Sequence, residues 1–316
     1  MNPENEKPLV TVTGVLGKQG LSVAHSLLNS GQYRVRGITR RADTPEGRKL
    51  KALGVELKSI PLSVGYEQEY IEAFKGSDSV FLITPAIAPP ESYEFELGKQ
   101  LADAALEAGV KHVIFSSLEN VSRITGNRKF APHFTDKARV EEYIRTLPFT
   151  STFIYMAFFY TNLIEFYTPI LEGDTLVFPI YLPRDFSAPF VDPLTATGPA
   201  VLEILSNRQE YAGKALPVIG EVISPQKMVE AFSKVTGKKA VYKSAYTREE
   251  FLNYFPSFKS NDELVDEILG MAEYAVEFGY FQKDRDWEWS RRINPGTLSW
   301  EQFLRNTGWQ GEKYSY

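Results

Sequence analysis

Three glycines near the start of the chain have the spacing of a phosphate-binding turn. Gly14, Gly17 and Gly20 form a G-x-x-G-x-x-G pattern between a short β-rich run and an amphipathic segment. Glycine there allows a tight turn, a close approach to a pyrophosphate and close packing of helix on strand. The following helix N-terminus adds N–H groups and a positive dipole end. We therefore expect a dinucleotide site with contacts from Gly14, Leu16, Gly17, Lys18, Gln19 and Gly20, the alternative being a turn without a ligand.

Two arginines after the second expected strand indicate which dinucleotide binds. Many NAD enzymes place Asp or Glu about 20 residues after the turn, where the carboxylate binds the ribose 2′-hydroxyl. This chain has Arg40 and Arg41 at that distance from Gly20. A guanidinium can bind a 2′-phosphate through two hydrogen bonds, whereas an acid would repel it. The sequence therefore favours NADP(H) over NAD(H), and the alternative is that both arginines are solvated loop charges.

A lysine and a histidine form the third group that could do chemistry. Lys137 lies three and seven residues before Val140 and Ile144, so it shares the apolar face of the helix that they predict. Burying an ammonium without a partner is costly, so we expect Lys137 to meet a ribose hydroxyl or a substrate oxygen. His133 lies one helical turn earlier and could share this face. The alternative is a lysine whose ammonium reaches solvent.

These residues need a sheet that brings the ends of several strands together. Strand-like runs alternate with amphipathic segments along the first half of the chain. The strand-like runs are 9–13, 34–39, 55–57, 79–84, 112–117 and 150–155. Such alternation indicates an α/β fold, a doubly wound parallel Rossmann sheet covered by helices on both faces. Ligands bind such sheets at the carboxyl ends of the strands. We therefore add Thr84, Pro85 and Ser116 to the expected cofactor contacts.

The second half of the chain is less regular and has the pattern of a smaller α+β domain. Asp192-Pro193 and Ser224-Pro225 each combine a helix N-cap with proline at the first helical position. We expect a cofactor-binding domain over 1–155, to which 187–208 returns, and a substrate or partner domain over 156–316. We also expect Thr135 or Asp136 to cap the helix that carries Lys137.

Composition excludes several kinds of chemistry. The 316 residues include no cysteine, which excludes disulfides, thiol nucleophiles and zinc–thiolate sites. The three histidines lack metal-ligand spacing, so we expect no metal. A net charge of −5 does not suggest direct nucleic-acid binding. No apolar run approaches the roughly 18 residues of a membrane span, and no signal peptide is visible. We therefore expect a cytoplasmic protein away from membranes, with the nucleus as an alternative location.

Several motifs together resemble the NmrA-like family, whose members are atypical short-chain dehydrogenases/reductases. The motifs are the glycine turn, Arg40, the SSLEN segment at 116–120 and the run 133–143. The resemblance covers nearly the whole chain and is strongest to the NmrA-like NADP(H)-sensor proteins. In the superfamily, the tyrosine of a Tyr-x-x-x-Lys pair donates the proton and the lysine binds the nicotinamide ribose. Here His133 stands at the tyrosine position and Lys137 at the lysine position.

The resemblance implies two alternative functions. A missing tyrosine is typical of redox-sensing regulators that respond to the NADPH/NADP ratio through a protein partner, or as a homodimer. The alternative is an NADPH-dependent reductase of a small hydrophobic carbonyl, imine or enone, with Lys137 and His133 as catalytic candidates. The resemblance also places Phe159, Tyr160 and Asn162 at the nicotinamide end of the site. We expect an apolar pocket there, completed by Phe166, Tyr167, Phe178 and Phe186.

Overall fold

A parallel sheet organises the first half of the protein. The structure is a computed structural model that describes residues 7–85, 91 and 93–314. Within these residues, seven parallel strands have the order β11-β6-β5-β4-β1-β2-β3. Their bounds are β1 (Leu9–Thr13), β2 (Arg34–Thr39), β3 (Glu56–Ser59), β4 (Ser79–Leu82), β5 (His112–Ser117), β6 (Thr150–Met156) and β11 (Ala215–Val218). The strand order reverses between β1 and β4, which is where ligands bind doubly wound sheets.

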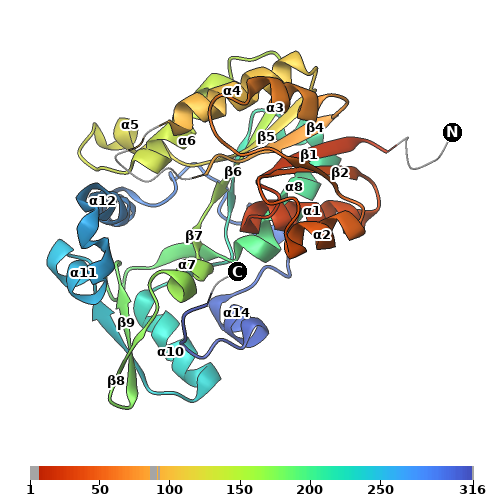
Figure 1. The fold of residues 1–316 in the computed structure, drawn as a ribbon. Helices are drawn as coiled ribbons and strands as arrows, with labels where there is room; N and C mark the ends of the chain where they lie inside the picture. Colours follow the sequence, from red (N-terminus) through yellow and green to blue (C-terminus); the bar gives the residue numbers. More distant parts are fainter. Residues whose placement is uncertain (1–6, 86–90, 92, 315–316) are drawn as a thin grey trace.

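Helices cover both faces of this sheet (Figure 1). One face carries α1 (Lys18–Ser30), α2 (Pro45–Ala52) and α8 (Pro193–Ser206), and the other carries α3 (Glu67–Phe74), α4 (Glu94–Glu107) and α6 (Pro132–Ile144). Close helix packing depends on glycine at two positions. A Cβ on Gly198 would lie 2.2 Å from the Ser22 carbonyl oxygen, and one on Gly98 would lie 2.3 Å from a methyl of Val140. The helices of the α1–α8 pair and of the α4–α6 pair therefore pack closely against each other. This packing fixes the positions of α1, α4 and α6 beside the strand ends.

Smaller sheets and more helices form the rest of the described chain. One sheet has the order β12-β10-β7 and another has the order β13-β9-β8. The strands are β7 (Phe158–Phe159), β8 (Ile170–Glu172), β9 (Thr175–Ile180), β10 (Ala188–Val191), β12 (Glu221–Ile223) and β13 (Ala240–Ser244). The helices are α5 (Val121–Thr125), α7 (Tyr160–Glu165), α9 (Arg208–Tyr211), α10 (Pro225–Thr236), α11 (Arg248–Tyr254), a 3₁₀ turn (Pro256–Ser260), α12 (Asp262–Phe278), α13 (Trp289–Ile293) and α14 (Trp300–Thr307).

The structure confirms the predicted fold class and corrects some details. An unexpected strand, β11, pairs with β6, and α8 packs on α1, so 193–218 contributes to the layers of the central sheet. The division at residue 155 remains a prediction. The cap expected at Thr135 or Asp136 is wrong, because α6 begins at Pro132 with Ala131 as N-cap. Proline suits the first helical position because its missing N–H needs no partner there.

None of the helices that the structure describes is long and apolar enough to cross a membrane. No group of three or more His, Cys, Asp or Glu side chains in the described residues is placed to hold a metal ion.

Candidate functional site

The glycine turn leads directly from β1 into α1. Gly14 has a φ of +60°, and its carbonyl accepts the Gly17 N–H at 2.8 Å. A Cβ on Gly20 would lie 2.3 Å from the Gly14 carbonyl oxygen, so glycine is required there for the helix to begin against the turn. Across the described residues, no side chain caps the first turn of α1, and that turn contains no acidic residue. This arrangement suits an anion at the helix N-terminus.

One end of the cleft lies beside this turn and carries positive charge. A cavity of about 490 Å³ is lined here by residues from the ends of β1 and β2 and from the loop after β3. Arg40 and Arg41 both line it with exposed side chains. The Arg41 backbone N–H donates to the Thr39 hydroxyl at 3.1 Å, which fixes the start of this loop. The lining residues are Gly14, Leu16, Gly17, Thr39, Arg40, Arg41, Pro61, Leu62, Ser63, Pro85 and Tyr93.

Tyr70 holds the loop after β3, which forms part of the wall of this cavity. Its hydroxyl lies 2.7 Å from the Pro61 carbonyl oxygen and accepts the Ser63 N–H at 3.0 Å. Burial raises the pKa of Tyr70 to about 12, so the phenol stays neutral. Tyr70 carries no sequence signal of this role, because a tyrosine on a helix is most often a core residue.

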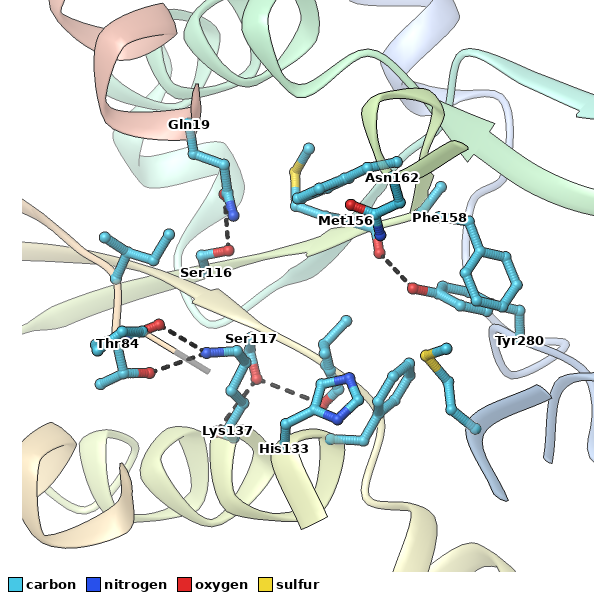
Figure 2. Close-up of a pocket in the computed structure, with 17 residues that line it drawn as sticks. Gln19, Thr84, Ser116, Ser117, His133, Lys137, Met156, Phe158, Asn162 and Tyr280 are labelled. Carbon is cyan, nitrogen blue, oxygen red and sulfur yellow. Dashed lines mark hydrogen bonds between the residues drawn. The ribbon is translucent and has the colours of Figure 1, made fainter. Parts of the chain in front are cut away.

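The other end of the cleft is an apolar cavity of about 350 Å³. Figure 2 shows Lys137 and His133 from α6 on one side, with Asn162 and Tyr280 across from them. Pro85 lines both cavities, so they are neighbouring parts of one cleft at the strand ends. The lining residues are Gln19, Ile83, Thr84, Pro85, Ser116, Ser117, Leu118, His133, Phe134, Lys137, Met156, Ala157, Phe158, Phe159, Asn162, Met271 and Tyr280.

A buried carboxylate accompanies Lys137. The Lys137 ammonium donates to the carbonyl oxygen of Thr84 at 2.9 Å and to its hydroxyl at 3.0 Å, and it forms an ion pair with Glu94. The Thr84 hydroxyl in turn donates to Glu94 at 2.6 Å. Lys137 is 9% exposed and Glu94 is 1% exposed. The predicted burial of Lys137 is therefore confirmed, and Glu94 is a partner that the sequence analysis missed.

A second buried carboxylate holds His133. Glu267 of α12 accepts the His133 backbone N–H at 3.1 Å and also contacts the ring nitrogen Nδ1. The His133 ring packs edge-on against Phe134, with ring centroids 4.7 Å apart. The sequence places Glu267 far from His133, and no local signal links them.

The cavity also contains a tyrosine that the sequence analysis missed. The hydroxyl of Tyr280 donates to the Met156 carbonyl oxygen at 3.0 Å (Figure 2). Burial raises the pKa of Tyr280 well above its ordinary value. The hydroxyl proton of Tyr280 is therefore held in a hydrogen bond to the main chain.

The end of β5 is tied to the start of α1 across the cavity. The Ser116 hydroxyl donates to the side-chain oxygen of Gln19 at 2.9 Å (Figure 2). Both residues were predicted cofactor contacts, and the structure brings them together beside Thr84 and Lys137. Phe159 and Asn162 line the same cavity from the start of α7.

Tyr160 does not reach the cavity. Its side chain is fully buried, its ring stacks on Phe190 with centroids 6.0 Å apart, and it also packs against Trp300. Residues three apart share one face of a helix, so Phe159 and Asn162 point together whereas Tyr160 points into the core. Lys18 also lies outside the lining of both cavities and pairs with Glu165.

The four aromatic residues expected to complete the pocket lie elsewhere. Phe166 is 58% exposed. Tyr167 packs against the rings of α11 and the following turn, and Phe178 packs against Phe232. Phe186 is partly buried against the core. The aromatic walls of the cavity come instead from Phe134, Phe158, Phe159 and Tyr280.

Comparison with known proteins identifies the family. The sequence profile of the NmrA-like family matches residues 6–304. This chain belongs to the NmrA-like family. Among NmrA-like relatives, a family domain-containing protein of Dictyostelium discoideum is 31% identical over 285 residues, covering 87% of this chain and 91% of the relative. The NmrA-like family domain-containing oxidoreductase lnaB of Aspergillus flavus is 32% identical over 302 residues, covering 89% and 85%.

Two solved structures with a bound cofactor have the same fold. The negative transcriptional regulator NmrA in complex with NADP superimposes with a TM-score of 0.74 at 23% identity, with 95% of each chain covered. The Escherichia coli NADPH-dependent quinone oxidoreductase QOR2, complexed with NADPH, superimposes with a TM-score of 0.75 at 17% identity, covering 95% of this chain and 99% of QOR2. At these identities the similarity establishes the fold alone.

Proposed function

We propose that this protein binds NADP(H) in the two-part cleft and is an NADPH-dependent reductase of a small, apolar carbonyl, imine or enone. The observation that carries the proposal is that Lys137 and His133 line one apolar cavity at the strand ends, each held by a buried carboxylate. Relatives such as lnaB of Aspergillus flavus are named oxidoreductases, which supports the proposal.

The cleft suits a dinucleotide phosphate along its length. The uncapped start of α1 would face the pyrophosphate, and Gly20 allows this helix to begin directly against the glycine turn. The exposed guanidinium groups of Arg40 and Arg41 would bind the 2′-phosphate. Relatives of the same fold have been solved with NAD, NADP and NADPH. NADP(H) therefore fits the charges at the glycine-turn end.

The apolar end supports the chemistry of a reduction. When bound, NADPH supplies the hydride. Lys137 would hold the nicotinamide ribose, while Phe158 and Phe159 would exclude water from the reacting carbon. His133, in its protonated form, would provide the proton that the reduced substrate takes up.

The test is a panel of quinones, enones and imines incubated with NADPH while the absorbance of reduced nicotinamide is followed. Lys137→Ala should lower turnover at least about 100-fold. The control is Lys234→Ala, which removes a lysine whose side chain is 68% exposed and paired with Glu301 on the surface. The proposal fails if no acceptor is reduced, or if Lys137→Ala and Lys234→Ala behave alike.

A second candidate is a redox-sensing regulator, and the contacts of Lys137 favour it. Lys137 links α6 to the end of β4 and to the first turn of α4 through Thr84 and Glu94. A cofactor that competes for Lys137 would alter these links. Such a regulator requires the cofactor-bound and empty forms to differ in affinity for a protein partner or for a second copy. It would work in the cytoplasm or the nucleus without contacting nucleic acid.

The test of this second candidate is a titration with NADPH and NADP⁺. The oligomeric state is measured by light scattering, and partners are captured on the immobilised protein with and without each cofactor. A cofactor-dependent change in either would support regulation. An unchanged oligomeric state with no cofactor-dependent partner would count against it.

A further inference from the structure

The contact between His133 and Glu267 has the geometry of an oriented histidine. The same carboxylate oxygen of Glu267 accepts the His133 backbone N–H at 3.1 Å and contacts ring nitrogen Nδ1. Glu267 is buried, with its side chain 5% exposed, whereas the His133 side chain is 20% exposed and lines the cavity. One buried carboxylate therefore fixes both the start of α6 and the orientation of the ring.

The position of Glu267 is itself held by packing around α12. A Cβ on Gly270 would lie 2.1 Å from the Phe130 carbonyl oxygen, so α12 contacts the backbone of the loop before α6 directly. Lys129 of that loop donates to Glu273 at 2.8 Å and to Glu277 at 2.6 Å. These contacts hold α12 against the mouth of the cavity and place Glu267 beside His133.

The other proton-bearing groups of the cavity are engaged differently. The Lys137 ammonium is bound by Glu94 and Thr84, and the Tyr280 hydroxyl donates to the main chain. The Nδ1 of His133 is bound by Glu267, while its Nε2 has no hydrogen-bond partner among the residues that the structure describes. A carboxylate on Nδ1 selects the tautomer with the proton on that nitrogen and leaves Nε2 for a ligand.

We infer that Glu267 is the positioning residue that orients His133, with Nε2 toward the cavity, as the proton donor of the reduction. The inference rests on the proposed reductase function. A carbonyl or imine carbon accepts a hydride from NADPH and forms a C–H bond as the C=O or C=N π bond breaks, while the oxygen or nitrogen takes the proton from Nε2 of protonated His133. The products are the alcohol or amine, NADP⁺ and neutral imidazole, which then takes a proton from water.

The tautomer of His133 provides a test that needs no substrate. The chain has three histidines, so ¹⁵N-histidine NMR gives few signals, and the spectrum of His133→Asn assigns the one from His133. At a pH where the ring is neutral, as it is after proton transfer, we expect the Nδ1–H tautomer in the unmodified protein and in Glu267→Gln, which retains an acceptor oxygen. Glu267→Leu should shift the ring toward the Nε2–H form, while the signal of His25, exposed on α1, stays unchanged.

Turnover then separates positioning from general structure. Glu267→Leu should lower kcat about 100-fold with KM changed less than about twofold, and Glu267→Gln should recover part of kcat. The matched control is Glu263→Gln on the same helix, which changes an exposed glutamate in the first turn of α12. It should leave the His133 tautomer and kcat unchanged.

Three results would overturn the inference. They are an Nε2–H tautomer in the unmodified protein, a tautomer that Glu267→Leu does not change, and a kcat that Glu267→Leu does not lower. NADPH binding, measured by calorimetry on the same variants, separates this failure from that of the proposed function. If NADPH binds and an acceptor is reduced while Glu267→Leu matches the unmodified protein, only the role of Glu267 is wrong. If no acceptor is reduced, the reductase function and proton donation fail together, and the tautomer still decides whether Glu267 orients the ring.

Discussion

Replacing Glu94 with glutamine tests whether the buried ion pair at Lys137 supports the fold as well as the site. The side chains of Lys137 and Glu94 are only 11% and 2% exposed. Glutamine keeps nearly the same volume and one acceptor oxygen, but it removes the negative charge. The ammonium would then remain buried, with only the neutral acceptors of Thr84 and the new amide around it.

The expected size of the effect follows from this burial. Breaking a buried ion pair by removing one partner costs about 3–5 kcal/mol, because the remaining charge is left without compensation. The two oxygens of Thr84 continue to accept hydrogen bonds from Lys137, so we expect a loss of about 3 kcal/mol in the free energy of unfolding, at the lower end of that range. Replacing both partners, as in Glu94→Leu with Lys137→Met, should recover most of this loss, since apolar pairs of similar volume substitute well for buried ion pairs.

Urea denaturation at pH 7, followed by circular dichroism, measures these free energies. The control is Glu72→Gln, because Glu72 pairs with Lys75 on the surface of α3 and both side chains are more than half exposed. That substitution should cost less than about 1 kcal/mol. The reasoning is refuted if Glu94→Gln costs no more than Glu72→Gln, or if the double variant is less stable than Glu94→Gln.

Two further predictions concern the cofactor and pH. Arg40→Ala should weaken NADPH binding at least about tenfold in calorimetric titrations and leave NADH binding nearly unchanged, because a charge-assisted hydrogen bond to the 2′-phosphate is lost; equal losses would contradict this. Burial lowers the pKa of His112 from 6.5 to about 4, so the unfolded chain takes up this proton first as the pH falls. Between pH 7.5 and 5, the free energy of unfolding of the unmodified protein should fall by about 2 kcal/mol more than that of His112→Asn. Parallel plots of unfolding free energy against pH for the two proteins would contradict this prediction.

Local sequence signals were sufficient to predict much of the fold. The alternation of strands and helices gave the doubly wound sheet, and the Asp192-Pro193 and Ser224-Pro225 pairs correctly marked the starts of α8 and α10. The strand β11 was missed because Pro217 interrupts a short apolar run. Proline removes a ladder hydrogen bond and is tolerated mainly in edge strands, and β11 is indeed the edge of the sheet.

The site residues at the ends of strands were predictable from the sequence. The partners that distant segments contribute were less predictable. The ends of β4 and β5 brought Thr84 and Ser116 to one cavity as expected, together with Lys137 from α6. Burial of Lys137 indicated that it needs a partner, but the chain has 40 acidic residues and the pattern could not select Glu94. Glu267 is still less predictable, because it lies 134 positions after His133 in the sequence and only the packing of α12 brings them together.

The reductase and the regulator make different demands on Lys137. Its ammonium has three protons, and its acceptors are the carbonyl oxygen of Thr84, the hydroxyl of Thr84 and the carboxylate of Glu94. A ribose hydroxyl that replaces the Thr84 hydroxyl leaves the ion pair intact, because Thr84 keeps its own hydrogen bond to Glu94. That exchange would hold α6 and α4 in place, as a rigid active site requires. A ribose that displaces Glu94 instead would leave a buried carboxylate without its cation and favour movement of the first turn of α4. Whether Glu94 keeps its contact with Lys137 when NADPH binds therefore distinguishes the two functions.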